Sequence, residues 1–286
     1  MKIIYIAPSK LPSDKANSIH VLNQSIAFSN VGYKLKLITI RKFLFEKKFI
    51  RKIKDYYGLN SKNLNIKIKS KYFPFNYANS FIIFLYSIFF IIFSNKYSLI
   101  ISRNLYSAYF GCILKKKNLI YETHQIEKGI QSYIQRKIFL SNIKTILISN
   151  KLKFHLENNY NLKIKNYEIL HDAAPLGEPL NLDEKFNLLN KYIKDQHNWN
   201  VKIGYFGSLY EGRGIEFISE LAKYNQDKLF MIFGSHKSSF FFKKNMKFYG
   251  RISHSNALKI MKCVDILIMP YQNKVSIGQN NHDTSM

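Results

Sequence analysis

The sequence contains few cysteines and no apolar run long enough to span a membrane. Its 286 residues include two cysteines, Cys112 and Cys263, which lie far apart in apolar surroundings. This spacing excludes a disulfide framework and a cysteine metal site, and it favours buried thiols in a reducing compartment. The most apolar stretch, 81–93, is shorter than the ~20 residues of a transmembrane helix, so a buried or interfacial helix is expected.

The N-terminus lacks the pattern of a secretory signal. The apolar run within residues 1–8 is too short for a signal peptide and leads directly into a strand-like pattern. We therefore expect a cytoplasmic protein. Peripheral contact with the inner face of the plasma membrane is an open alternative.

Acidic residues are scarce as well, with 18 Asp and Glu against 44 Lys and Arg, which gives a formal net charge of +26. Such an excess is typical of proteins that bind nucleic acid or an anionic membrane surface. The lysines are scattered, however, and are not interleaved with aromatic residues in a known motif that reads nucleic acid. Specific nucleic-acid binding is not expected, and non-specific binding stays as an alternative.

One segment concentrates basic and aromatic residues. Residues 41–54 (RKFLFEKKFIRKIK) predict a basic amphipathic helix, with Phe45 and Phe49 on different faces from Lys48 or Lys52. Such a helix suits an anionic membrane surface. A solvated lysine face above an ordinary core contact explains the pattern equally well.

Strand and helix patterns alternate in the first part of the sequence. Helical spacing of apolar residues is found at 19–27 and 108–114, between short apolar strands predicted at 2–6, 34–40, 98–102, 118–121 and 145–149. A repeated strand–helix–strand order favours a parallel sheet. We therefore predict a first domain over residues 1–175.

A second series follows a polar segment, 176–200, which we interpret as a linker. It consists of strands at 201–206, 229–233, 247–250 and 265–269, with a helix at 255–261. Residues 276–286 are polar and predict neither a helix nor a closing strand. The expected fold class is α/β, with two Rossmann-like domains, of which the second, 201–286, is incomplete.

The turn after the first strand of the second domain is rich in glycine. It reads GYFGSLYEGRGIEFI over 204–218, so glycines and Arg213 lie between the end of a strand and the start of a helix. Unpaired N–H groups and the helix dipole favour an anion there, and glycine lets a phosphate approach the main chain. A tight turn with a surface arginine explains the same residues, so both interpretations stay open.

The order of several segments resembles the retaining glycosyltransferases of the GT-B fold, often called family 4, in which two Rossmann-like domains face a cleft. The segments are 13–21 (SDKANSIHV), 121–127 (YETHQIE), 148–155 with 169–174, and 204–218. Further matches at 248–252 (FYGRI) and 266–271 (ILIMPY) correspond to the family's nucleobase-side turn and to the strand before its main catalytic segment. The resemblance covers nearly the whole chain.

The resemblance implies roles for residues of the first domain. Ser18 and His20 are expected on the acceptor side of the cleft, and His124 is the catalytic candidate that contacts the sugar. Glu122 is expected to be an architectural hydrogen-bonding group. For Ser18 and His20 the competing interpretation is helix capping by Asn17 or Ser18.

In the second domain, the resemblance makes the glycine turn the donor site. Gly207, Ser208, Arg213 and Gly214 occupy the places of the family's diphosphate clamps, where Arg213 keeps one basic group and Ser208 replaces the other. The lost charge is expected to weaken diphosphate binding by about 1 kcal/mol or more. Arg251 is a further donor-binding candidate, with an exposed turn residue as the alternative.

The implied reaction moves a sugar from a nucleotide diphosphate sugar to a cell-envelope or lipid-linked glycan, with retention at the anomeric carbon. No cofactor or metal is expected, and no paired aspartates suggest a metal-held diphosphate. The chain ends before the family's glutamate-rich segment. A truncated chain that binds nucleotide sugar weakly or not at all is therefore the alternative.

Overall fold

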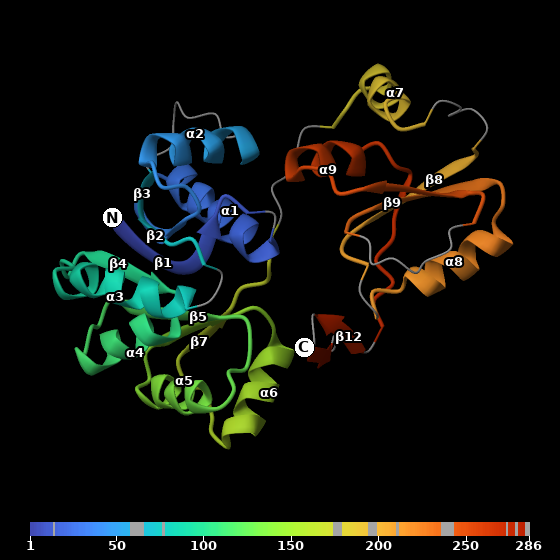
Figure 1. Ribbon diagram of the computed structural model, residues 1–286. Helices are drawn as coiled ribbons and strands as arrows, with labels where there is room; N and C mark the ends of the chain where they lie inside the picture. The colour runs from blue at the N-terminus through green and yellow to red at the C-terminus, as the bar shows by residue number, and fades with distance from the viewer. Residues whose placement is uncertain are drawn as a thin grey trace. The chain divides into compact units, whose positions relative to one another are not determined.

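A computed structural model of the chain describes residues 1–13, 15–57, 66–75, 78–173, 179–193, 199–209, 212–235, 243–272, 274–277 and 280–283. The chain divides into two compact units, which are Met1–Pro175 and Leu176–Met286 (Figure 1). Each unit contains its own parallel sheet and its own helices. The expected α/β class with two Rossmann-like halves is confirmed.

The first unit is built around a seven-stranded sheet in the order β3-β2-β1-β4-β5-β6-β7, with all neighbours parallel. Its elements are β1 (Lys2–Leu11), α1 (Ala16–Asn30), β2 (Lys34–Arg41), α2 (Glu46–Tyr57), β3 (Ile66–Tyr72), α3 (Asn79–Ile92), β4 (Ser98–Ser102), α4 (Leu105–Ile113), β5 (Leu119–Thr123), α5 (Ile130–Leu140), β6 (Lys144–Leu147), α6 (Asn150–Tyr160) and β7 (Tyr167–Ile169).

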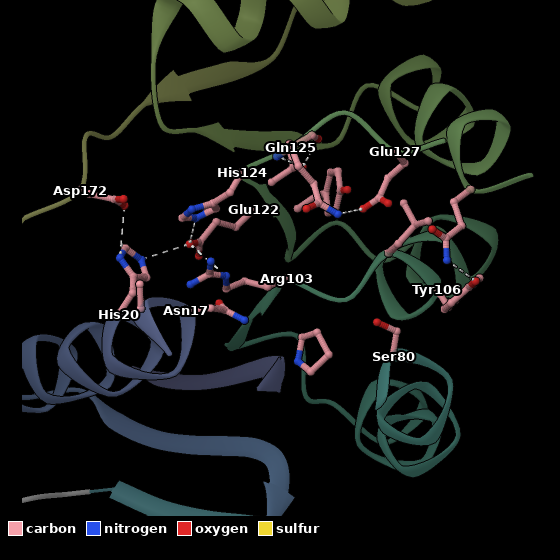
Figure 2. A pocket seen from close by; sticks show the side chains of 16 residues that line it. Asn17, His20, Ser80, Arg103, Tyr106, Glu122, His124, Gln125, Glu127 and Asp172 are labelled. Carbon is pink, nitrogen blue, oxygen red and sulfur yellow. Dashed lines mark hydrogen bonds and ion pairs between the residues drawn. The ribbon is translucent and has the colours of Figure 1, made fainter. Parts of the chain in front are cut away.

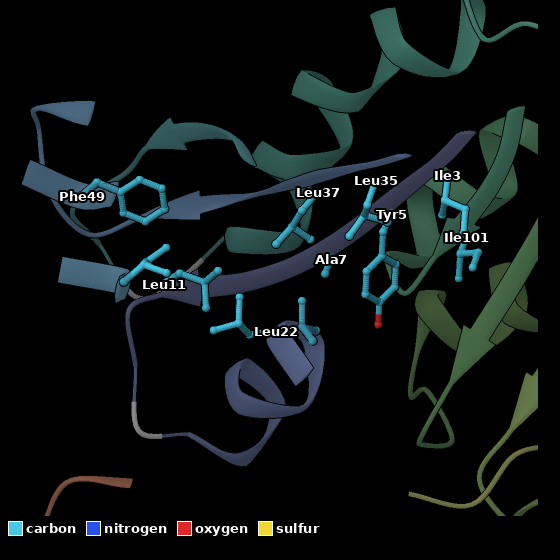
Figure 3. Close-up of a cluster of buried hydrophobic side chains, with 11 residues drawn as sticks. Ile3, Tyr5, Ala7, Leu11, Leu22, Leu35, Leu37, Phe49 and Ile101 are labelled. Carbon is cyan, nitrogen blue, oxygen red and sulfur yellow. The ribbon is translucent and has the colours of Figure 1, made fainter. Parts of the chain in front are cut away.

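Both faces of this sheet are covered, because alternate residues of the central strand are apolar on each side. Ile3, Tyr5 and Ala7 of β1 pack with residues of α1 and α2, and Figure 3 shows this cluster. Ile4 and Ile6 point to the other face, where they pack against α3. The figure of the whole chain shows α1 and α2 on one side of the sheet and α3, α4 and α5 on the other (Figure 1).

The helix predicted over the basic segment 41–54 begins only at Glu46, because Arg41 ends β2, and it packs as an ordinary surface helix. Phe49 and Ile53 of α2 are buried in the core cluster, while Lys47, Lys48 and Lys52 are exposed. The interpretation as a lysine face above a core contact is confirmed. The apolar face of α2 is therefore not free to lie on a membrane, although Leu44 and Phe45, just before the helix, are exposed.

The second unit contains a four-stranded parallel sheet in the order β10-β9-β8-β11. Its elements are α7 (Leu182–Asn190), β8 (Val201–Phe206), α8 (Ile215–Tyr224), β9 (Lys228–Phe233), β10 (Met246–Gly250), α9 (His254–Met261), β11 (Ile266–Leu267), β12 (Lys274–Ile277) and β13 (Asn280–Asp283).

Helix α7 lies within the segment that the sequence analysis interpreted as a linker. Asn181 caps it, and the Glu184 side chain accepts a hydrogen bond from the Asn181 N–H in return. Leu189 and Ile193 are buried in a cluster with residues of β9 and α9. The helix packs on the core of the second unit, so this part of the segment is structured.

The polar residues near the end of the sequence contain two short strands that the sequence analysis did not predict. Strands β12 and β13 pair antiparallel, with Lys274 opposite Asp283 and Ile277 opposite Asn280. They form a two-stranded sheet of their own and do not extend the four-stranded sheet. Antiparallel pairing uses main-chain groups, so a polar side-chain pattern did not reveal it. Residues 278–279 and 284–286 lie outside the described residues.

Asn104 caps α4 and links it to α3 at the end of β4. Its side-chain oxygen accepts hydrogen bonds from the N–H and the hydroxyl of Ser107, both at 2.8 Å. Its amide donates to the carbonyl oxygen of Ser80 at 2.8 Å. We expect Asn104→Ala to lower the free energy of unfolding by about 2–3 kcal/mol, because the cap is lost and buried groups are left unpaired.

Urea denaturation followed by circular dichroism measures this change. Asn158→Ala, at an exposed position of α6, is the matched control and should stay within about 0.5 kcal/mol of the native chain. Equal stability of the two variants would contradict a structural role for Asn104.

Candidate functional site

A cavity of about 450 Å³ opens in the first unit, at the carboxyl ends of its central strands. It is lined by residues of β1 and β5, by the residues that follow β4, β5 and β7, and by the first turns of α1, α3 and α4. In parallel α/β sheets, ligands bind at this edge. The topology therefore brings together side chains that are far apart in the sequence.

Glu122, at the centre of this region, is the meeting point of donors from three other elements (Figure 2). Its Oε1 lies 2.9 Å from Nε2 of His124, 3.6 Å from Nε2 of His20 and 3.6 Å from Nε of Arg103. Its Oε2 lies 3.3 Å from the hydroxyl of Tyr5 and accepts from the Gln24 amide, also at 3.3 Å. The carboxylate is 3% exposed. Its expected architectural role agrees with these contacts.

The surroundings of Glu122 favour its ionised form. Burial acts to raise the pKa of the carboxyl, but hydrogen bonds from His124 and His20 and the charge of Arg103 outweigh it. The pKa is therefore held well below its usual range. The same contact affects Tyr5, whose pKa is raised well above its ordinary value by burial and by the Glu122 charge.

The structure brings His20 and His124 together at the cavity. Their rings lie edge to face, with centroids 5.1 Å apart, and both line the cavity. Nδ1 of His20 lies 3.2 Å from Oδ1 of Asp172, which follows β7. His20 thus connects α1 to Glu122 on one side and to Asp172 on the other.

Ser18 is placed differently from His20. It is buried in the first turn of α1, and its hydroxyl donates to the carbonyl oxygen of Lys10 at 3.3 Å. It does not line the cavity described above. The capping interpretation is wrong as well, because the residue at the N-cap position is Lys15, which makes no side-chain capping bond. Asn17 lines the cavity instead.

Arg103 is a cavity residue that the sequence analysis missed. It follows β4 directly, its side chain is 9% exposed, and it lines the cavity. Within the part of the chain that the structure describes, its Nη1 is buried and has no hydrogen-bond partner. A buried guanidinium N–H without a partner is costly, so this group is available to an acceptor atom of a ligand. A single arginine after a strand gives no motif that would have revealed it.

His20, Glu122 and His124 are also the residues best placed to hold a metal ion. Their ligand atoms lie within 4.8 Å of one another, and two imidazoles with one carboxylate is a donor set that suits zinc. Two features compete with a cation. Nε2 of His124 is hydrogen-bonded to the carboxylate, and the positive Arg103 is 3.6 Å from the same oxygen.

The glycine turn of the second unit lies at the carboxyl edge of the other sheet. Gly207, which follows β8, donates from its N–H to the carbonyl oxygen of Phe233 at 2.9 Å. Ser208 is half-buried, and its carbonyl oxygen accepts from the hydroxyl of Tyr205 at 2.9 Å. Tyr210 and Glu211 lie outside the described residues.

Two glycines let the loops at this edge approach closely. Gly214, the N-cap of α8, has φ +79°, and a Cβ there would lie 2.0 Å from the carbonyl oxygen of Pro270. A Cβ on Gly234, which follows β9, would lie 1.7 Å from the carbonyl oxygen of Gly207. Any side chain at either position would push the backbone of the turn apart.

Arg213 precedes the N-cap of α8. Its guanidinium stacks on the ring of Tyr271, with Cζ 4.5 Å from the centroid. Among the described residues its buried Nε has no hydrogen-bond partner. Arg251 follows Gly250 at the end of β10 and is exposed, so it occupies the same edge of the sheet as the turn.

Comparison of the sequence with known proteins gives no match, because no family model and no curated protein is similar enough. Solved structures do match. Sucrose-phosphate synthase from Thermosynechococcus elongatus aligns with a TM-score of 0.66 at 12% identity, over 97% of this chain and 77% of that one.

Two further matches contain bound ligands. Anabaena HepE in complex with UDP and glucose aligns with a TM-score of 0.65 at 11% identity, over 98% of this chain and 76% of that one. A point mutant of S. aureus TarM, in complex with fondaparinux, alpha-GlcNAc-glycerol and UDP, aligns with a TM-score of 0.61 at 10% identity. The alignment covers 95% of this chain and 81% of that one. At such identities the likeness shows the fold alone, which is the GT-B fold of glycosyltransferases.

The charge of Glu122 makes stability depend on pH. We expect Glu122→Gln to lower the free energy of unfolding by about 3 kcal/mol near neutral pH, because the buried donors lose their charged partner. The folded-state pKa lies below that of an unfolded glutamate, about 4.3, so the stabilisation is present above that value and is lost as the pH falls below it.

Thermal unfolding between pH 5 and pH 3 measures this dependence. The difference between the native chain and Glu122→Gln should shrink across that interval. Glu168→Gln, which removes an exposed carboxylate paired with Lys144, should change stability little at any pH. A gap that stays constant down to pH 3 would show that the Glu122 charge does not contribute.

Proposed function

We propose that the chain is a retaining glycosyltransferase that moves a sugar from a nucleotide diphosphate donor to a glycan or lipid-linked acceptor. The observation that carries the proposal is the turn before α8, where the buried Nε of Arg213 has no hydrogen-bond partner within the described residues and lies next to the start of a helix. The likeness in fold to HepE, whose solved structure contains UDP and glucose, supports a nucleotide sugar as the ligand.

The turn has the chemistry that a diphosphate needs. The first N–H groups of α8 have no partners within the helix, and the positive end of the helix dipole lies at Gly214. The absence of a side chain at Gly214 lets Pro270 pack against the start of the helix, and Arg213 adds a full positive charge. As the bond between sugar and diphosphate stretches, negative charge grows on the leaving phosphate. Fixed dipoles and Arg213 then stabilise the transition state more than the ground state.

The cavity of the first unit is proposed to bind the acceptor and to supply His124 as the residue that contacts the sugar. Its polar groups come from Arg103, His20, His124 and Glu127, and its volume of about 450 Å³ fits a sugar-sized group. Glu122 holds both histidines in place and acts as a positioning residue. Arg251 is proposed to contact the nucleotide on the donor side.

The proposal includes no metal. The Glu122 carboxylate that a metal would share is already hydrogen-bonded to His124 and lies 3.6 Å from the Arg103 guanidinium, so it has partners without a metal. The two free thiols, Cys112 and Cys263, suit a cytoplasmic location for the enzyme.

Binding of a nucleotide sugar without turnover is a second candidate. It is favoured by Ser208, which has a hydroxyl where the resembling family has its other basic clamp. A hydroxyl supplies one hydrogen bond and no charge, which makes the donor site weaker by about 1 kcal/mol or more.

Calorimetric titration with UDP, GDP and inorganic phosphate tests the donor site. We expect one nucleoside diphosphate to bind and Arg213→Ala to lower its affinity at least about tenfold, because a charge-assisted hydrogen bond is lost. EDTA should leave the affinity unchanged. Lys223→Ala, which removes a charge from the last turn of the same helix, is the matched control. Binding that survives Arg213→Ala, or that EDTA abolishes, would contradict the proposed site.

A substitution of His124 distinguishes the two candidate functions, which are sugar transfer and binding without turnover. We expect His124→Ala to keep the nucleotide affinity and to reduce release of UDP or GDP from the sugar donor by about 100-fold. His171→Ala is the control, because His171 is exposed and its Nδ1 is hydrogen-bonded to the carbonyl oxygen of Ile148. Coupled measurement of released nucleotide, with and without a membrane extract as acceptor, gives the rates. If the native chain binds the nucleotide sugar but sets free no UDP or GDP from it, the second candidate is favoured.

A further inference from the structure

Helix α3 has one buried face and one exposed apolar face. Ile83, Ser87 and Ile91 are buried against the sheet and α4. The exposed face consists of large apolar side chains that are 45–71% exposed, namely Phe81, Leu85, Phe89, Ile92 and Phe93. Phe81, Leu85, Phe89 and Phe93 are each four residues apart, and Ile92 is three residues after Phe89, so these side chains form one stripe along the helix and its C-cap. We call it the α3 stripe.

The α3 stripe continues onto the end of α4. Ile113 and Leu114, at the C-terminus of α4, are exposed, and the two helices are joined there because Nζ of Lys116 donates to the carbonyl oxygen of Ile92 at 3.0 Å. The stripe and these two residues together expose several large apolar side chains at the adjoining ends of α3 and α4. Soluble proteins rarely expose such a patch unless it contacts something else.

Cations surround this surface on two sides. The sequence from Asn79 to Asn118 contains no Asp or Glu, and Lys96, Lys115 and Lys117 are exposed on its loops. On the side of the sheet edge, Nζ of Lys36 lies 5.0 Å from the ring centroid of Phe90. The pKa of Lys36 is lowered by burial and by the charges of Lys2, Lys69 and Lys67. The apolar surface therefore has a basic rim.

An apolar surface with a basic rim could contact either a second copy of the chain or a lipid bilayer, and the charge distinguishes between them. A second copy of the chain would bring a formal charge of +26 against another +26, and basic rims would face each other. An anionic bilayer matches both parts, because apolar side chains enter the boundary of the acyl chains while lysines contact the headgroups. No described helix is long and apolar enough to cross a membrane, which leaves contact parallel to the surface.

We propose that the α3 stripe and its basic rim dock the first unit on the surface of an anionic lipid bilayer. The stripe begins one residue after Ser80, which lines the cavity. The cavity of the first unit is therefore held close to the lipid surface. If the proposed function holds, this placement suits an acceptor that is itself anchored in the membrane.

Vesicle co-sedimentation of the full chain tests the docking. The probes are phosphatidylcholine vesicles with and without phosphatidylglycerol. We expect binding to the anionic vesicles, and Leu85→Ser with Phe89→Ser should lower it by about tenfold or more. Both side chains are exposed, so the fold should be unaffected. Lys115→Gln with Lys117→Gln should weaken binding and reduce its dependence on salt.

The control variant makes the same kind of substitution, large apolar to serine, at exposed positions of the second unit. Leu182→Ser with Phe217→Ser removes two exposed apolar side chains of the second unit and should bind anionic vesicles as the native chain does. UDP titration of every variant reports on the donor site separately, so loss of docking and failure of the proposed function are distinguishable.

Three results would overturn the proposal. The first is native chain that does not bind the anionic vesicles. The second is equal binding of the Leu85 and Phe89 variant, which would show that scattered lysines alone cause attraction. The third is a native dimer in analytical ultracentrifugation that the same variant makes monomeric, which would make the stripe an interface between two copies.

Discussion

The ionised, buried carboxylate of Glu122 is the interaction on which the arrangement of the first unit's cavity depends. Without its charge, His20, His124 and Arg103 would be three donors facing one another in a partly buried space. With it, residues from α1, β4 and β5 are held at fixed distances, and Tyr5 and Gln24 anchor the second oxygen. The desolvation of one carboxylate is offset by several charged or polar donors, which is the condition under which a buried charge is tolerated.

In the second unit, main-chain contacts order the loops at the corresponding edge of the sheet. There the loops after β8, β9 and β10 are joined by main-chain hydrogen bonds, from Gly207 to Phe233 and from Gly234 to Gly250, both at 2.9 Å. Close approach of backbone replaces electrostatics, and it is possible only because Gly214 and Gly234 have no side chains. Within the part of the second unit that the structure describes, the Nε of Arg213 has no hydrogen-bond partner.

Most strands of the two sheets could be predicted because they are apolar on both faces, as Ile3 to Ile6 show. The edge strand β3 has lysine at alternate positions and was not predicted. Helix α7 also had a signal, since Asn181 and Glu184 form a capping box, but the polar residues around it favoured a linker. The cavity was predictable only in part. His20 and His124 could be located because each lies next to a helix or strand that the sequence predicts. Glu122, in contrast, contacts Tyr5 and Gln24, which are 117 and 98 residues away along the chain. Arg103 belongs to no motif. Such contacts depend on strand order, which local patterns do not determine.

The lysine-rich composition has two effects at the edge strand β3. The lysines repel one another, and they disfavour the addition of another strand to the sheet. Its sequence, IKIKSKY, pairs only with β2, and Lys67, Lys69 and Lys71 are exposed along it. An open parallel edge in a chain with 47% hydrophobic residues is a template on which another strand can add. Charged side chains at every second position make that addition unfavourable, because an incoming edge would have to desolvate them. Lys67 and Lys69, whose charges lower the pKa of Lys36, thus also disfavour aggregation through this edge.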